Sequence, residues 1–293
     1  MSAPTLAAWP NGKKIAVAVK IMFEAWSEGK WPPYIATASA PKEGVVNTAA
    51  QAWATYGGHV GAWRMLESLD KLNVPATFFT SARCTELYPD AVKQIVACGH
   101  DLAGHSYSQD QLLTYLKPDE QRAMIRRCID MLQQCAGHKV TGWACPSVAF
   151  TPETAGLLAE AGLKWHADVT YTDLPFCMPT PYGTIAGVPT TDFSDLRVFK
   201  ASTQDFFDVY KGLLKYHEQL DSMSMIVLVL HTQFAGRPVM TAVFEQTLRH
   251  LAQSPHVWFT RHKDMGEWAL QTGRDSLSYA DRFKLRSAAG RGR

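Results

Sequence analysis

The sequence predicts an α/β fold in which parallel strands alternate with helices and close into a (β/α) barrel. Short apolar runs rich in β-branched residues, of which 226–230 is the clearest, have the length and bounds of buried strands. Amphipathic segments separate these runs, and strands that alternate with helices in this way form parallel sheets with right-handed crossovers. Eight such units within 293 residues approach the size of a closed barrel, and the 46% hydrophobic content supplies its core.

Each predicted strand ends at a polar or turn residue. The first run begins after Gly12 and ends at Glu24, and the third contains Gly104 just after its apolar pair. A glycine inside a strand lets another group approach the backbone closely. We expect strands over 15–23, 75–81, 101–106, 140–145, 164–169, 184–189, 224–231 and 257–261.

The predicted helices carry start and stop signals. Pro118 and Pro152 stand where a first helical position is expected, and Gly137 ends the helix that begins near Pro118. We expect helices over 61–72, 90–98, 120–135, 151–162, 205–219, 242–253 and 265–272.

A long segment precedes the first of these helices. Residues 31–46 are rich in Pro, Gly, Ser and Ala, which predicts a loop, and Tyr56–His59 carries two glycines that predict a turn. Long loops in compact domains usually cover a site or a partner. Because 31–58 is too apolar to be only a solvated loop, we expect the chain to form a homo-oligomer.

Composition excludes several classes of partner. The formal net charge is +2, with 29 basic and 27 acidic side chains and no long charged run, so nucleic acid is not an expected partner. No stretch has the length of a membrane span, so no membrane is expected either. We expect a single catalytic barrel domain over 1–293, with its core at about 15–272 between an N-terminal extension and a C-terminal tail.

The cysteines and the N-terminus indicate a reducing compartment. The six cysteines are scattered, with no CxxC pair, and are expected to be reduced and mostly buried. The first residues lack the basic start and apolar run of a signal peptide. We therefore expect a cytoplasmic protein.

Polar residues gather where the predicted strands end. In a barrel the carboxyl ends of the strands share one mouth, where carboxylates and imidazoles can converge into a hydrolytic site. A carboxylate beside apolar walls, as Glu24 is beside Trp26, has a raised pKa that suits acid–base work. The strand-end residues are Glu24, Ser81, His105, Gln109, Trp143, Cys145, Pro146, His166, Asp168, Asp173, His231, Arg261 and His262.

Plainer interpretations stay open for several of these residues. His105 can be a structural histidine at a strand end, and Asp168 and Asp173 can cap turns. Cys145 fits no nucleophile motif, so packing is favoured for it. Three aromatic residues can be either core residues or the wall of a small-ligand pocket, namely Trp26, Tyr107 and Trp143.

At these residues the chain resembles the polysaccharide deacetylase superfamily, and within it the allantoinase-like branch and bacterial cyclic imide hydrolases. The resemblance covers about 15–268 and implies a distorted (β/α) barrel, an enzyme acting on C–N bonds and a homotetramer. The matching pieces are Met22–Trp26, Gly99–Asp101, Gly104–Tyr107, Gly142–Trp143, Asp168, Asp173–Pro175, Leu230–His231, Gly236–Pro238 and Val257–Phe259.

The chain departs from the deacetylase pattern at the metal site. Typical members end the first strand with two aspartates and supply two metal-binding histidines four residues apart. Here the first pair is Glu24 and Ala25, and the second is His105 and Gln109. The resemblance still implies a divalent metal, with Zn²⁺ the first candidate. His105 is the first ligand expected, and Glu24 and the carbonyl oxygen of Gln109 are candidates for the others. Because a carboxamide is a poorer zinc ligand than imidazole, we expect weak metal retention.

The resemblance leads to an expected reaction, in which water opens a cyclic imide at a ring C–N bond. Glu24, or a metal through bound hydroxide, would activate the water, and His231 would protonate the departing nitrogen or polarise the carbonyl. Three alternatives stay open: a metal-free allantoinase-like hydrolase, a carbohydrate N-deacetylase and a barrel that only binds small molecules. The expected substrate contacts are Trp26, Tyr107 and Trp143 around the flat ring and Gln109 at the imide edge.

Overall fold

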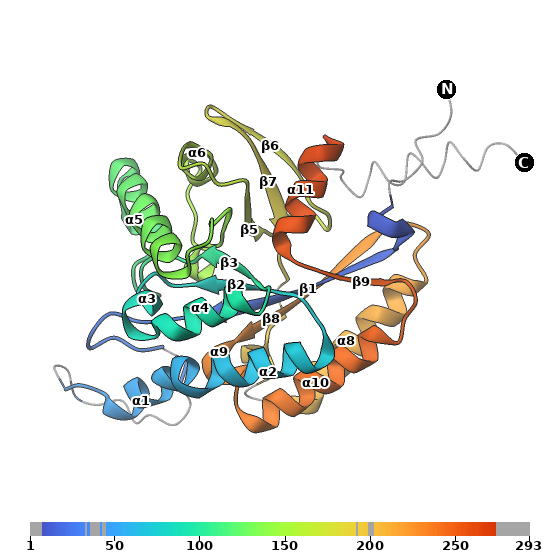
Figure 1. Ribbon diagram of the computed structural model, residues 1–293, viewed down its shortest axis with the longest axis horizontal. Helices are drawn as coiled ribbons and strands as arrows, with labels where there is room; N and C mark the ends of the chain where they lie inside the picture. The colour runs from blue at the N-terminus through green and yellow to red at the C-terminus, as the bar shows by residue number, and fades with distance from the viewer. Residues whose placement is uncertain are drawn as a thin grey trace, which may run out of the picture.

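The computed structural model describes residues 8–32, 34–35, 42, 45–191, 193–198 and 202–273. Its strands form one sheet in the order β6-β7-β5-β4-β3-β2-β1-β8, and β9 also pairs with β1 (Figure 1). The strands are β1 (Ile15–Phe23), β2 (Ala76–Thr80), β3 (Asp101–Gly104), β4 (Gly142–Trp143), β5 (Trp165–Val169), β6 (Phe176–Thr180), β7 (Gly183–Pro189), β8 (Ser224–His231) and β9 (Val257–Thr260).

The sheet curls into an incomplete barrel. Apart from the antiparallel pair β6–β7, the pairings between strands are parallel. A single bridge between Ser194 and Val229 joins the chain after β7 to β8 at the opposite end of the strand order. Strand β2 pairs with the second half of β1, from Val19 to Phe23, whereas β9 pairs only with its first half, from Ile15 to Ala18.

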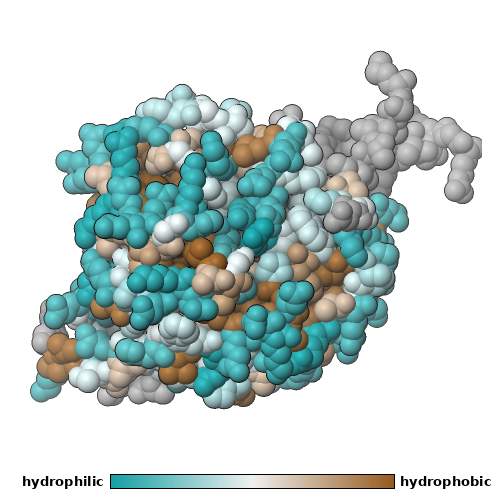
Figure 2. Space-filling model, viewed as in Figure 1, coloured by the Kyte–Doolittle hydropathy of each residue, from teal (hydrophilic) through white to brown (hydrophobic). Residues whose placement is uncertain are grey.

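Helices cover the outside of this sheet (Figure 1). The surface in Figure 2 is mainly polar, with apolar patches between the polar ridges. Among the described residues no helix is long and apolar enough to cross a membrane. The main helices are α1 (Thr48–Tyr56), α2 (Ala62–Leu72), α4 (Pro89–Ala97), α5 (Pro118–Ala136), α6 (Thr154–Glu160), α8 (Thr203–Glu218), α10 (Pro238–Ala252) and α11 (His262–Thr272), with short helices η1 (Pro10–Gly12), α3 (Cys84–Leu87), η3 (Leu113–Tyr115), η4 (Pro146–Val148), α7 (Asp195–Val198) and α9 (Thr232–Ala235).

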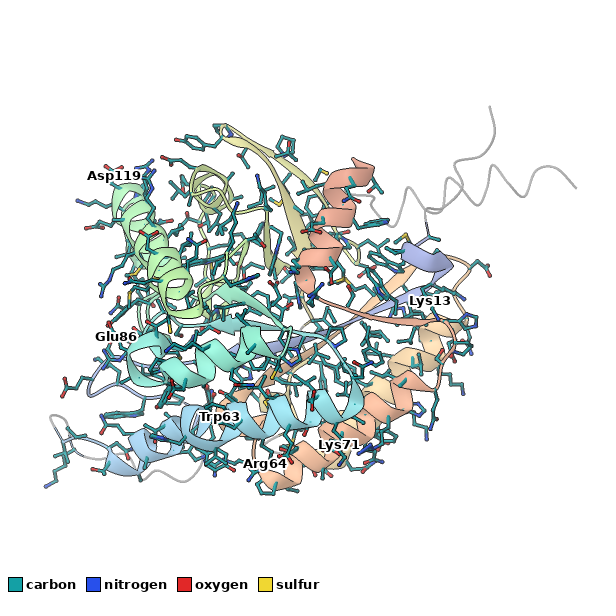
Figure 3. The ribbon with its side chains drawn as sticks, viewed as in Figure 1. Lys13, Trp63, Arg64, Lys71, Glu86 and Asp119 are labelled. Atoms are coloured by element: carbon teal, nitrogen blue, oxygen red, sulfur yellow. The ribbon has the colours of Figure 1, made fainter. Side chains whose placement is uncertain are left out.

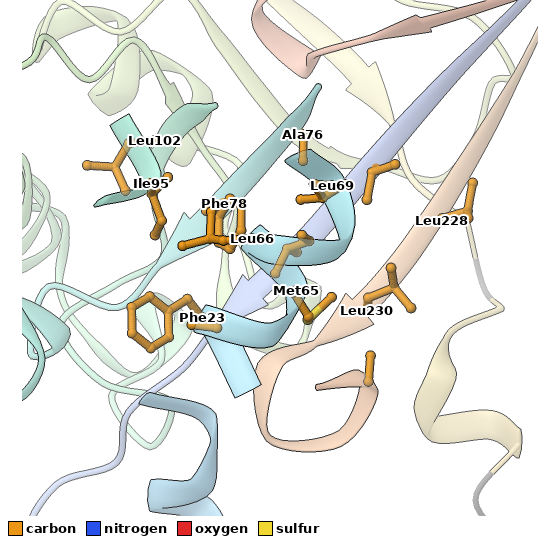
Figure 4. Packing of buried hydrophobic residues seen from close by; sticks show 14 of the residues in the cluster. Phe23, Met65, Leu66, Leu69, Ala76, Phe78, Ile95, Leu102, Leu228 and Leu230 are labelled. Atoms are coloured by element: carbon orange, nitrogen blue, oxygen red, sulfur yellow. The ribbon is translucent and has the colours of Figure 1, made fainter. Parts of the chain in front are cut away.

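Alternation along β1 separates two cores. Val19, Ile21 and Phe23 face the helices and pack against residues such as Leu66 of α2 (Figure 4). The intervening apolar residues of β1, including Met22, belong to a second cluster inside the barrel. The same two-residue period predicts that Glu24, just past the strand, follows Met22 toward the barrel interior.

The eight predicted strands are present, but two expectations were wrong. The antiparallel strand β6, which contains Pro179, was not predicted; it lies at the end of the strand order, where a proline costs no ladder hydrogen bond. The predicted turn at Tyr56–His59 is instead a π-helical segment, η2 (Gly57–Gly61), that joins α1 to α2. Its glycines serve close packing, because a Cβ on Gly61 would overlap the carbonyl oxygen of Thr232.

This packing makes a testable prediction. Gly61→Ala should lower the free energy of unfolding by about 1–3 kcal/mol, because its backbone is helical and only the overlap with the backbone of Thr232 opposes a side chain. Gly212→Ala is the matched control. Nothing lies within 4 Å of the added Cβ in α8, so alanine should stabilise there by about 0.5–1 kcal/mol. Urea unfolding of both variants measures the difference, and equal stabilities would contradict the packing argument.

Candidate active site

Glu24 stands at the centre of the site. It follows β1 at the carboxyl edge of the sheet and is only 6% exposed. Its Oε1 lies 3.7 Å from Nε2 of His105 and 3.8 Å from Nε2 of His231. One carboxylate oxygen therefore faces two imidazoles, which stand at the carboxyl ends of β3 and β8.

The other oxygen of Glu24 is anchored. Oε2 accepts a hydrogen bond of 2.7 Å from Nε2 of Gln233 and one of 3.3 Å from the hydroxyl of Tyr34. Gln233 is completely buried, so this anchor is rigid. Oε1 is left as the oxygen that can accept a proton.

The charge state of Glu24 differs from the expectation. Burial alone would raise the pKa of its carboxyl, but the charge of His231, the facing imidazole of His105 and the hydrogen bond from Gln233 outweigh burial and hold the pKa below its ordinary value. The sequence predicted a raised pKa because it showed the apolar run of β1 and not the imidazoles that face the carboxylate. Glu24 is thus an anion at neutral pH.

His231 is held by a buried carboxylate. Its Nδ1–H donates to Oδ1 of Asp195 at 2.7 Å, and its backbone N–H donates to Oδ2 of the same residue at 2.6 Å. Burial lowers the pKa of His231, but Asp195 and Glu24 raise it more, to about 8. His231 is therefore protonated at neutral pH and presents Nε2–H toward Glu24.

His105 is held by a backbone carbonyl. Its Nδ1 lies 2.7 Å from the carbonyl oxygen of Ala144, which can only accept, so Nδ1 carries a proton. Its Nε2 is buried and has no hydrogen-bond partner among the described residues. This nitrogen faces Glu24 and is available to a water molecule, a substrate or a cation.

Gln109 and Trp26 lie beside this centre. The backbone N–H of Gln109 donates to the carbonyl oxygen of Ala25, and its side-chain amide donates to Oγ of Ser81 at 3.2 Å. These bonds tie the loop after β3 to the segment after β1. Trp26 follows Ala25 and is partly exposed.

The other two predicted substrate contacts are engaged elsewhere. The hydroxyl of Tyr107 donates to Glu86 at 2.9 Å, and its ring lies 4.4 Å from the guanidinium of Arg127. Trp143 is completely buried in the core that faces the helices, where its ring occupies the space left by the missing Cβ of Gly104. These contacts give both rings a structural role.

Strand β9 does not bring Arg261 and His262 to the mouth, contrary to the sequence prediction. The reason is that β9 pairs only with the first half of β1 and ends well below Glu24. Arg261 instead binds Asp264 within its own helix turn. His262 is fully buried between the rings of Trp165 and Phe79.

The polar residues of β5 also serve the structure. Both carboxylate oxygens of Asp168 accept the backbone N–H of Cys145, at 3.0 and 2.9 Å. The thiol of Cys145 is buried and its pKa is raised well above the ordinary value, which fits packing and not nucleophilic attack. Nδ1 of His166 lies 3.8 Å from Oδ2 of Asp168, and its Nε2 contacts the sulfur of Met178. Asp173, beyond the end of β5, is exposed.

Sequence reasoning missed Asp195, Gln233 and Tyr34. Asp195 lies at the start of α7, beyond the end of β7 at Pro189, so the pattern of polar residues at strand ends does not reach it. Gln233 follows His231 by two residues. A buried strand that ends in two polar side chains was the available signal for it.

The donors around Glu24 do not complete the expected metal site. Within the described part of the chain no group of three His, Cys, Asp or Glu side chains is arranged to hold a metal ion. Nε2 of His105 and Oε1 of Glu24 lie 3.7 Å apart, His231 carries a proton on the nitrogen that faces Glu24, and the side-chain amide of Gln109 donates to Ser81. The acidic and imidazole side chains here therefore do not supply three metal ligands.

Comparison with known proteins agrees with the overall fold. A model of the polysaccharide deacetylase family matches residues 55–166. The crystal structure of PuuE allantoinase covers 94% of this chain and 96% of its own, with 25% identity and a TM-score of 0.81. The chain has a polysaccharide deacetylase fold. A probable polysaccharide deacetylase from Pseudomonas aeruginosa PAO1 is similar to the same extent, with 25% identity, a TM-score of 0.80, and coverage of 93% of this chain and 96% of its own. The predicted fold class, a distorted (β/α) barrel of polysaccharide deacetylase type, is thereby confirmed.

Curated relatives match over a shorter region. The peptidoglycan deacetylase of Helicobacter pylori is 27% identical over 127 residues, which are 43% of this chain and 41% of that protein. The peptidoglycan-N-acetylglucosamine deacetylase of Bacillus cereus is 28% identical over 117 residues, or 40% of this chain and 39% of that protein. The chain thus spans about two fifths of the length of these two relatives.

Proposed function

We propose that this protein opens a small cyclic imide, or a related cyclic amide or ureide, by hydrolysis of a ring C–N bond. The observation that carries the proposal is the position of Glu24 Oε1, an anionic oxygen between the imidazole of His105 and the protonated imidazole of His231. This arrangement places a base, an orienting imidazole and an acid around one point.

The reaction follows from these protonation states. Glu24 Oε1 takes a proton from a water molecule that His105 Nε2 orients, and the hydroxide attacks the ring carbonyl. The protonated Nε2 of His231 faces the tetrahedral intermediate and then gives its proton to the ring nitrogen as the C–N bond breaks. The product is a carboxylic acid joined to an amide, and this acid gives up its proton to solvent. Glu24 then returns its proton to His231. Asp195 keeps His231 in the tautomer that this step requires.

A substrate panel tests the proposal. Succinimide, dihydrouracil and hydantoin should be opened, with loss of ring absorbance and appearance of one carboxylate for each ring. N-acetylglucosamine oligomers serve as the competing substrates, because the curated relatives are named as deacetylases. Release of acetate from the oligomers without ring opening would replace the imide proposal by N-deacetylation.

The donor set leads to a prediction on metal content. Because the described residues form no group of three acidic, imidazole or thiol ligands, a divalent cation such as Zn²⁺ should be retained weakly, and gel-filtered protein should hold well under one metal ion per chain. Elemental analysis and ring-opening rates before and after chelation measure this. One tightly held ion, lost together with activity in His105→Ala, would show instead that His105 and Glu24 are ligands.

We also propose that the protein is a homo-oligomer, as the apolar segment 31–58 indicates, and a homotetramer, as the family resemblance implies. The segment 31–58 exposes apolar side chains, among them Val45 at 56% and Val46 at 54%. Sedimentation at micromolar concentration should give four chains, and a monomer there would contradict the proposal.

A further inference from the structure

Arg237 is a cation near the site that has no counter-ion among the described residues. Its guanidinium carbon lies 4.2 Å from the ring centre of Tyr56 and 5.3 Å from that of Trp53, and Nε donates to the carbonyl oxygen of Gln233 at 3.1 Å. Burial lowers the pKa of Arg237, and no carboxylate among the described residues offsets this. Its Nη1 and Nη2 groups donate to no described residue, so they are free to bind a ligand.

Two paths of residue contacts connect Arg237 to Glu24. The backbone of Gln233 accepts from Arg237, while the side chain of the same residue donates to Oε2 of Glu24. In the second path, the ring of Trp53 packs edge-on against that of Tyr34, with 6.2 Å between the ring centres, and the Tyr34 hydroxyl donates a hydrogen bond to Oε2 of Glu24. Arg237 is therefore linked to the carboxylate of Glu24 through Gln233 on one path and through Trp53 and Tyr34 on the other.

This position is rigid. The hydroxyl of Tyr56 accepts from Arg64, which also donates to the carbonyl oxygen of Gly236 at 2.6 Å. Arg64 comes from α2 (Figure 3). The glycines of η2 let α1 and α2 lie directly on the 232–236 segment, so the ring under Arg237 cannot move away. A planar guanidinium fixed on one edge, with two Nη groups free, matches the geometry of a carboxylate.

We propose that Arg237 binds a carboxylate group carried by the substrate, outside the ring bond that is cleaved. The proposal rests on the ring-opening function and narrows it to cyclic imides, amides or ureides with an anionic side group. Binding such a group would pair a half-buried charge that no described carboxylate pairs, and would orient the ring carbonyl toward Glu24.

The test compares hydantoin with hydantoin-5-acetate, which differ by one carboxylate. Wild-type kcat/KM should be at least about tenfold higher for the acetate, and Arg237→Gln should reduce that ratio by about 10–100-fold, the usual effect of losing a charge-assisted pair. Arg237→Lys keeps the charge but loses the fork, so its ratio should be intermediate. Arg64→Gln, which removes the other guanidinium on Tyr56, should leave the ratio as in the wild type.

The outcomes separate this inference from the proposed function. An unchanged ratio in Arg237→Gln, or an equal ratio change in Arg64→Gln, would mean that Arg237 only braces Tyr56 and the 232–236 segment. If the wild type opens neither ring, the proposed ring-opening function is wrong. Calorimetric measurement of hydantoin-5-acetate binding then tests the carboxylate site at Arg237 by itself. Hydantoin-5-acetate should then bind the Glu24→Gln protein, and binding that survives Arg237→Gln would overturn the assignment.

Discussion

Glu24→Gln should lower kcat for ring opening by about 10²–10⁴-fold and leave the fold intact, since a positioned general base usually contributes that much. The glutamine side chain has the same size, and its oxygen can still accept the hydrogen bond from Gln233 that holds Oε2 in the wild type. The amide cannot take a proton from water. Steady-state kinetics on hydantoin, with circular dichroism as the check on folding, measures the effect.

Two further readouts sharpen this result. KM should change little, because Glu24 acts on water and not on the ring. Gln233→Leu removes the anchor but keeps the carboxylate, so it should lower kcat less than Glu24→Gln does. Near-normal turnover in Glu24→Gln would remove Glu24 from the role of base.

Asp195→Asn should lower kcat by a similar factor of about 10²–10⁴ and shift the alkaline limb of the pH profile to lower pH. In the wild type the pKa of His231 is about 8, above its ordinary value of 6.5, because Asp195 and Glu24 favour the imidazolium despite burial. The acid form is present below about pH 8 and is lost above it. Without the Asp195 charge, burial lowers that pKa, so the acid is lost at lower pH.

The acid limb supplies the internal control. The pKa of Glu24 is held below its ordinary value of 4.5, so kcat/KM of the wild type should fall only below that pH. Raised pKa values also contribute stability: His231 stabilises the fold fully below pH 6.5 and loses this contribution as pH rises through about 8. An alkaline limb near pH 8 that Asp195→Asn leaves in place would show that another group donates the proton.

The sequence by itself determined the strand–helix alternation and the edge on which the chemistry lies. Apolar runs that end in polar residues, such as β1 before Glu24 and β8 before His231, are readable because buried strands need apolar side chains and parallel strands share one carboxyl edge. The glycine in β3 also carried a correct signal of close approach, since Trp143 packs where its side chain would be.

Only the tertiary structure decided which strand-end residues meet. Arg261 follows a strand just as Glu24 does, but β9 pairs only with the first half of β1, so it ends before the carboxyl edge of the sheet. The register between segments that are distant in sequence cannot be deduced from local sequence patterns. Asp195 and Gln233 act through side-chain hydrogen bonds across more than 30 residues, which periodicity cannot show. The charge of Glu24 was decided in the same way, because a pKa depends on the groups that face it in space and not on its neighbours in the chain.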